Sequence, residues 1–228
     1  MGQIAQNLRS INSRIAAAAD RAGRDPAGIT LVAVSKLKPA SLIRAAYEAG
    51  HRAFGENYAQ ELRDKAEELA DLDIRWHFIG GLQRNKAKYV AAVASMMETV
   101  DSSELAEALD RRAEARLACL IEVNVAGEAS KSGVAPDEVG DLAQRILSLP
   151  NLELRGVMAI PPIEDDPERS RPYFRKLRDA LNKLNESIRL DVPLTELSMG
   201  MSHDFEIAVE EGATIVRIGT AVFGERSP

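Results

Sequence analysis

The sequence has one cysteine, no long apolar run and no excess of positive charge. A single cysteine, Cys119, excludes an internal disulfide and a metal cluster built on cysteines. No stretch approaches the roughly 18 uncharged apolar residues of a membrane span, and the N-terminal segment lacks the apolar part of a secretory signal. With 29 Lys and Arg against 35 Asp and Glu, the net charge of −6 argues against a nucleic-acid partner. We therefore expect a soluble, cytoplasmic protein that binds neither nucleic acid nor a membrane.

A regular alternation of strand and helix patterns fills most of the chain. Apolar, strand-like runs recur at steps of 22 or 23 residues, with helical patterns between them. The runs begin near Ile29, Arg52, Ile74, Met96 and Ala118, and three more span Leu152–Ile160, Thr195–Ser198 and Thr214–Ile218. Eight such units predict an α/β fold with a parallel sheet closed into a (β/α)8 TIM barrel. The main alternative is an open doubly wound sheet, which usually has fewer strands, and no GxGxxG motif opens a helix here.

An extra helix is predicted before the first strand. Ile4, Leu8, Ile11 and Ile15 follow one another at steps of 4, 3 and 4, which places them on one helical face. No linker or low-complexity tract divides the chain, so we expect residues 1–228 to form a single domain. The proline-rich stretch 161–167 is expected to be an exposed connection. The sequence ends soon after the eighth predicted strand, and we expect a monomer without an added domain.

Three polar residues follow or lie within the first three predicted strands, where a TIM barrel carries its chemistry. Lys36 ends the first strand on the face of Val32 and Val34. It is either a lysine paired at the surface or an amine whose pKa an apolar surround lowers, ready to form an imine with a carbonyl. Asn57 follows the second strand and is either a helix N-cap or a site residue. His77, in the third strand, is either a hydrogen-bonded core residue or part of a site.

The last two strands end in segments that suit phosphate binding. Ser198-Met199-Gly200-Met201-Ser202 follows the seventh strand, and Gly219-Thr220 follows the eighth. Many TIM barrels bind phosphate in these two loops through backbone N–H groups. Ser202 is alternatively a cap for the short helix expected near Phe205–Glu210. Arg217 points inward and requires an acceptor, which is either a carboxylate such as Glu122 or a ligand atom.

Closure of the barrel brings the first and the eighth strand together. Lys36 then lies beside Arg217 and the predicted phosphate loops. A cofactor with an aldehyde, a ring nitrogen and a phosphate would use all three, and pyridoxal 5′-phosphate is such a molecule.

Several motifs in order carry a resemblance to a known family. The chain resembles the pyridoxal phosphate homeostasis proteins, the YggS/PROSC family, which are similar in fold to the N-terminal barrel of alanine racemase. The resemblance runs from about Ile29 to Gly224. The matching motifs are Val34-Ser35-Lys36, Phe54-Gly55-Glu56-Asn57-Tyr58, Trp76-His77-Phe78-Ile79-Gly80, Lys131-Ser132-Gly133, Gly156-Val157-Met158-Ala159-Ile160, Leu197-Ser198-Met199-Gly200-Met201-Ser202 and Val216 to Gly224.

The resemblance implies a function and a set of roles. Members bind pyridoxal 5′-phosphate, have no established catalytic activity and keep cellular vitamin B6 in balance. It implies that Lys36 forms the Schiff base and that Arg217 lies by the pyridine nitrogen. The phosphate would be surrounded by Ser198, Met199, Ser202, Gly219 and Thr220, and the ring would be lined by Asn57 and His77. No metal ligand is implied.

The residues also favour a carrier over an enzyme. A racemase needs an acid/base group on each face of the substrate carbon, often a lysine and a tyrosine. All four tyrosines fall in predicted helices or at their starts: Tyr47, Tyr58, Tyr89 and Tyr173. We therefore expect a protein that carries or buffers pyridoxal 5′-phosphate for apoenzymes without robust catalysis.

Two other functions and one accessory role remain open. The chain could be an amino-acid racemase of the alanine racemase type, with His77 or a second subunit supplying the missing base. It could be a Schiff-base aldolase that acts on a sugar phosphate. Lys131 is either a solvated loop lysine or a second, transient amine for the cofactor.

Overall fold

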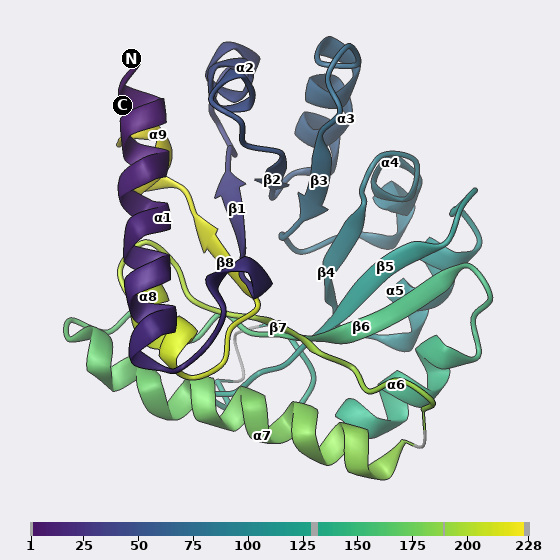
Figure 1. Cartoon of the computed structure of the whole chain (residues 1–228). Coiled ribbons are helices and arrows are strands. Elements are labelled where there is room, and N and C mark those ends of the chain that lie inside the picture. Colours follow the sequence, from purple (N-terminus) through teal and green to yellow (C-terminus); the bar gives the residue numbers. More distant parts are fainter. Residues whose placement is uncertain (1, 129–131, 189, 226–228) are drawn as a thin grey trace.

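Eight parallel strands form a closed barrel in chain order, surrounded by helices (Figure 1). The computed structural model describes residues 2–128, 132–188 and 190–225. The strands are β1 Thr30–Val34, β2 Ala53–Glu56, β3 Arg75–Phe78, β4 Met96–Val100, β5 Leu117–Glu122, β6 Leu152–Met158, β7 Glu196–Ser198 and β8 Ile215–Ile218. The helices are α1 Gln3–Arg21, α2 Ala40–Glu48, α3 Ala59–Glu68, α4 Ala87–Ala91, α5 Ser103–Asp110, α6 Val139–Leu147, α7 Arg171–Ser187, α8 Phe205–Glu210 and α9 Thr220–Phe223. The predicted TIM barrel with an extra N-terminal helix is confirmed.

The pairing of β1 with β8 closes the barrel. Val32 lies opposite Arg217, and Thr30 opposite Ile215, in a parallel register. This pairing excludes the open doubly wound sheet. It also places the residues that follow β1 next to those that follow β8, although about 180 positions separate them in the sequence.

Two apolar layers stabilise the barrel. The larger layer lies between the strands and the helices and includes Leu31, Phe54 and Phe78. A smaller cluster unites Val32, Ala53, Leu120, Met158 and Ile215. Its members come from five different strands and can meet only inside the barrel, because side chains alternate between the two faces of each strand. The interior is therefore apolar in part, and polar side chains fill the rest.

The N-terminal helix packs along the outside, where α1 runs beside α8 and α9 (Figure 1). Leu8, Ile11 and Ile15 are buried, as their spacing predicts. Beyond the helix, the Arg24 guanidinium donates to the carbonyl oxygens of Val209 and Ala213. Apolar contact and these hydrogen bonds attach the extra helix to the last two β/α units. None of the described helices combines the length and the apolarity needed to cross a bilayer.

Two predicted strand ends differ from the structure. The first strand ends at Val34, so Lys36 lies in the following turn rather than at the end of the strand. The sixth ends at Met158 rather than at Ile160, and the Ala159 carbonyl oxygen just beyond it accepts a hydrogen bond from Arg217. Both strands end sooner than predicted: Ser35 and Lys36 continue the alternation of β1 into a turn, and the apolar Ala159 and Ile160 continue the run of β6.

Candidate functional site

A pocket of about 400 Å³ opens at the C-terminal ends of the strands. Segments after β1, β2, β3, β6, β7 and β8 contribute to it, so it lies at the mouth of the barrel. Six of the nine predicted site residues line it: Lys36, Asn57, Ser202, Arg217, Gly219 and Thr220. The remaining walls are formed by Val34, Ile79, Ile160, Ile163, Glu164, Met201, His203 and Asp204.

Lys36 lies in a tight turn after β1. The Lys38 N–H donates to the Ser35 carbonyl oxygen across 3.0 Å, which makes Lys36 the second residue of a four-residue turn. Its side chain is half-buried in the pocket wall beside Val34. The lysine side chain therefore lines the pocket from the turn that follows β1.

Asn57 lines the pocket and is not the cap of the following helix. The residue that precedes α3 as its N-cap is Tyr58, and the Asn57 side chain lines the pocket. Among the described residues, its buried Oδ1 atom has no hydrogen-bond partner. A buried oxygen without a partner is costly, and a ligand in the pocket could supply the missing donor.

Arg217 is almost wholly buried and is one of the residues that line the pocket. Its guanidinium donates to the Ser198 hydroxyl at 2.5 Å and to the Ala159 carbonyl oxygen at 2.8 Å. The nearest carboxylate is Glu98, with an oxygen 3.8 Å from the guanidinium. Glu122, the partner considered from the sequence, instead accepts a hydrogen bond from Ser132. Burial lowers the pKa of Arg217, an effect that the charges of Glu98 and Glu122 oppose.

A column of polar side chains continues from Arg217 into the barrel. Ser198 donates to Glu98 at 2.5 Å, and the other Glu98 oxygen lies 2.6 Å from Nδ1 of His77. Burial raises the pKa of Glu98, but the hydrogen bond and charge of His77 and the charge of Arg217 outweigh it and hold that pKa below its usual range. The carboxylate is therefore ionised and compensates the buried guanidinium.

Three predicted site residues lie outside the pocket lining. Ser198 and His77 belong to the polar column beneath Arg217. The Met199 side chain is buried in the layer between strands and helices, and its N–H donates to the Ile215 carbonyl oxygen. Their predicted contacts with a phosphate or a ring stay predictions.

The loops after β7 and β8 line the pocket and contain backbone N–H groups without a protein acceptor in the described part of the chain. Among the residues that the structure describes, the N–H groups of Ser202, His203, Gly219 and Thr220 donate to no protein acceptor. Ser202 lines the pocket, whereas Asp204 is the N-cap of α8. Gly200 has a φ of +92°, and a Cβ atom there would come within 2.5 Å of Ala208. Glycine therefore lets the first loop lie close against α8, and backbone N–H groups without a protein acceptor are of the kind that can bind anions.

The proline-rich stretch 161–167, predicted to be only an exposed connection, also forms part of the rim of this pocket. Ile163, which is 86% exposed, and Glu164 belong to the proline-rich stretch after β6, and both line the pocket. Sequence reasoning missed this contribution, as it missed Glu98. A glutamate inside the apolar strand Met-Met-Glu-Thr-Val was the available indication, because a buried carboxylate requires a partner.

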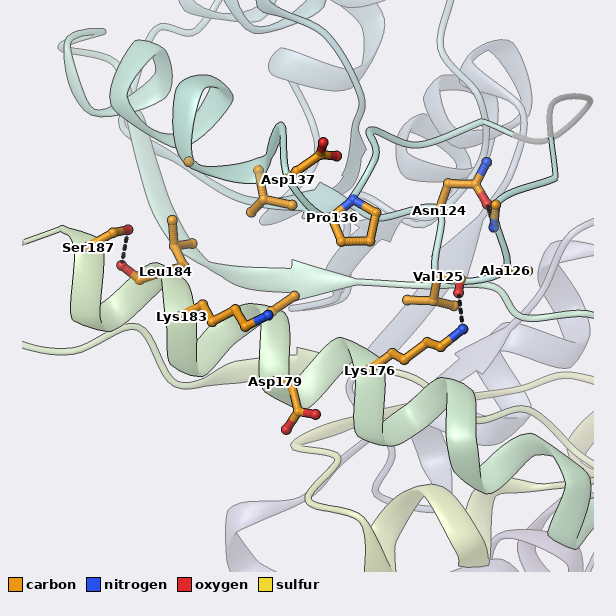
Figure 2. A pocket seen from close by; sticks show the side chains of 14 residues that line it. Asn124, Val125, Ala126, Pro136, Asp137, Lys176, Asp179, Lys183, Leu184 and Ser187 are labelled. Carbon is orange, nitrogen blue, oxygen red and sulfur yellow. Dashed lines mark hydrogen bonds between the residues drawn. The ribbon is translucent and has the colours of Figure 1, made fainter.

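A larger pocket, about 830 Å³, lies between the segment after β5, the start of α6 and the side of α7 (Figure 2). Its charged side chains, Asp137, Lys176, Asp179 and Lys183, are exposed, and Lys176 donates to the Val125 carbonyl oxygen at 3.4 Å. None of the nine predicted site residues lines it. Lys131 lies outside the described residues. Within the described part of the chain, no three His, Cys, Asp or Glu side chains are grouped to hold a metal ion.

A closed barrel with a lysine, a buried arginine and glycine-containing loops around a pocket at its mouth is the architecture of a TIM-barrel protein of the alanine racemase type. The family model "Alanine racemase, N-terminal domain" matches residues 6–227. The pyridoxal phosphate homeostasis protein of Aquifex aeolicus is 46% identical to this chain, and the match covers 97% of each chain. The protein of the same name in Pseudomonas aeruginosa is 49% identical, and the match covers 99% of this chain and 97% of the relative. PipY of Synechococcus elongatus, solved with PLP bound, superposes with a TM-score of 0.84 at 37% identity, covering 97% of this chain and all of PipY. The chain belongs to the family of pyridoxal phosphate homeostasis proteins.

Proposed function

We propose that the pocket binds pyridoxal 5′-phosphate, held as a Schiff base on Lys36, and that the protein carries or buffers this cofactor in vitamin B6 homeostasis without robust catalysis. The observation that carries the proposal is the meeting of Lys36, Arg217 and four open backbone amides around one pocket of about 400 Å³. The names of its relatives and the PLP-bound PipY structure support it.

The residues of the pocket fit each part of the cofactor. The amides of Ser202, Gly219 and Thr220 suit the phosphate, and the unpartnered Oδ1 of Asn57 can accept a hydrogen bond from a ligand donor. Lys36 would supply the amine that condenses with the aldehyde of the cofactor, with loss of the aldehyde oxygen as water. In enzymes, bound pyridoxal phosphate supplies an electron sink for carbanion chemistry.

Arg217 favours holding over catalysis. An arginine is a hydrogen-bond donor that stays protonated, so a pyridine nitrogen facing it remains unprotonated and withdraws electrons weakly. Glu98 and Ser198 fix this guanidinium from below. Arg217 would thus serve the ring nitrogen as a hydrogen-bond donor that keeps its own proton.

Borohydride trapping tests the proposal directly. Reduction of the loaded protein followed by peptide mapping should locate the cofactor on the peptide that contains Lys36. The Lys36→Ala variant should lose the visible absorbance and the trapped adduct. Lys38→Ala is the matched control, because Lys38 belongs to the same turn but its amine donates to the Gly224 and Glu225 carbonyl oxygens. An adduct that persists in Lys36→Ala at the wild-type stoichiometry would contradict the proposal.

The carrier role needs its own assay. The loaded protein should transfer pyridoxal 5′-phosphate to an apoenzyme, and purified protein should not racemise or decarboxylate amino acids at a steady rate. Cytoplasmic location and a monomeric state belong to the same proposal and are checked by fractionation and sedimentation. Robust turnover of an amino acid would favour the racemase alternative.

A further inference from the structure

The turn that carries Lys36 has an unusual backbone. Leu37, its third residue, has a φ of +59°, and among the described residues it is the one residue other than glycine with a positive φ. This sign is required at the third residue of a type II turn, where glycine or asparagine is preferred. Leucine there is strained, and such strain persists only where the surrounding structure enforces it.

Helix α3 enforces the turn from both ends. The Lys65 ammonium donates to the Ser35 carbonyl oxygen at 2.7 Å, at the start of the turn. The Glu61 carboxylate accepts a hydrogen bond from the Leu37 N–H at 2.6 Å, just after Lys36. Lys65 and Glu61 are themselves paired at 2.6 Å, one helical turn apart. Lys36 therefore lies between the Ser35 carbonyl group and the Leu37 N–H group, and the Lys65–Glu61 ion pair holds both groups.

A buried carboxylate completes this network. Glu56, at the end of β2, accepts from the Lys65 ammonium at 2.7 Å and from the Ser35 hydroxyl at 2.6 Å. Lys65, Glu56 and Ser35 are all buried. A lysine is rarely buried unless it is paired, and here its three donors have three acceptors: Ser35, Glu56 and Glu61.

We propose that Lys65, together with Glu56 and Glu61, is a positioning residue that fixes the Lys36 turn so that the Lys36 amine meets the aldehyde in the pocket. The inference rests on the proposed function. The network touches the backbone on either side of Lys36, and none of its three members lines the pocket. It should therefore govern formation of the covalent bond and leave the noncovalent contacts of the cofactor unchanged.

Two ligands distinguish an effect on the covalent bond from an effect on the noncovalent contacts. Pyridoxal 5′-phosphate can form the bond with Lys36, whereas pyridoxamine 5′-phosphate has no aldehyde and binds through phosphate and ring alone. Lys65→Met and Glu61→Gln should each weaken binding of pyridoxal 5′-phosphate about tenfold, the scale of one lost hydrogen bond to a charged group. Affinity for pyridoxamine 5′-phosphate should stay within about twofold of wild type. Matched controls are Lys183→Met, an exposed lysine on α7, and Glu67→Gln, an exposed glutamate on α3.

The outcomes are distinct. Loss of affinity for the aldehyde alone supports the inference, whereas equal losses for both ligands, or none, overturn it. If Lys65→Met does not fold, Glu61→Gln decides, because Glu61 is half-buried and its loss leaves Lys65 paired with Glu56. If wild-type protein gives no borohydride-trapped adduct on Lys36, the proposed function itself fails. A trapped wild-type adduct with unaffected variants overturns the positioning role alone.

Discussion

Two fully buried glutamates lie in different layers of the barrel, and burial affects them differently. Glu98, inside the barrel, has a partner on each oxygen: His77 on one, and Ser198 with Arg217 on the other. Glu56, next to α3, has Ser35 and Lys65 on one oxygen, and the other has no partner among the described residues. The pKa of Glu98 is lowered although burial raises it, whereas burial raises the pKa of Glu56 more than Lys65 and Ser35 lower it.

The comparison indicates that the number of polar partners, and not burial alone, decides the direction of the pKa shift. Both side chains are 0% exposed, so desolvation disfavours the ionised form of each. Three polar groups around Glu98 outweigh that penalty. At Glu56, the Lys65 ammonium divides its donors among three acceptors, and the penalty is only partly offset.

The largest effect is expected inside the barrel. Glu98→Ala should lower the free energy of unfolding by about 3–5 kcal/mol, because it leaves the buried Arg217 without its carboxylate. Urea unfolding followed by circular dichroism measures this change. A loss below about 1 kcal/mol would contradict the pairing, since that is the size of an exposed ion pair.

A double variant separates lost charge pairing from lost packing. Glu98→Met combined with Arg217→Met removes both charges and keeps apolar volume, so it should be more stable than Glu98→Ala alone. If the double variant is no more stable, the cost of Glu98→Ala arises from the cavity.

The effect of intermediate size is on the pH dependence of the free energy of unfolding, to which the two glutamates should contribute with opposite signs. The lowered pKa of Glu98 gives stability that is present above the unfolded pKa of about 4.3 and is lost as the pH falls through the folded value. The raised pKa of Glu56 makes stability fall as the pH rises above about 4.3 toward its folded value. A tenfold difference in acid dissociation constant between the folded and unfolded states changes the free energy of unfolding by about 1.4 kcal/mol.

Urea midpoints from about pH 3 to pH 8 check this sign. Relative to wild type, Glu98→Gln should weaken the loss of stability in acid, and Glu56→Gln should weaken the loss on going from acid to neutral pH. If both variants changed the pH dependence of stability in the same direction, the proposed difference between Glu98 and Glu56 would be wrong.

The smallest effect is expected at an exposed pair. Arg44 and Asp71 form two hydrogen bonds of 2.7 and 2.8 Å, yet both side chains are exposed to water. Asp71→Asn should leave the urea midpoint unchanged, because solvent screens the pair and mobile side chains lose entropy on pairing. A shift as large as that of Glu56→Gln would show that exposure matters less than hydrogen-bond geometry.

The fold was predictable because each β/α unit repeats one pattern. Strands buried on both faces give uninterrupted apolar runs, and helices with one buried face give a period of 3.6. Loops after β7 and β8 were identifiable from their glycines and hydroxyl residues. The end of β1 could not be identified from the sequence, because Ser35 and Lys36 continue the alternation of the strand until the turn begins.

The supporting networks could not be predicted from spacing. His77 meets Glu98 only because it pairs with Met96, which places Glu98 on the same face two residues further along. A shift of one residue in that register would turn the carboxylate outward. Lys65 lies among charged residues on a helix, where its sequence context is the same as that of an exposed lysine. Tertiary contact alone distinguishes it.

The register that pairs β1 with β8 has a consequence for biosynthesis. Lys36 emerges early from the ribosome, but Arg217, Gly219 and Thr220 emerge near the end of translation. Joining such distant segments carries a loop-closure cost and is expected late in folding. A nascent chain therefore has no complete pocket until its final strand is made.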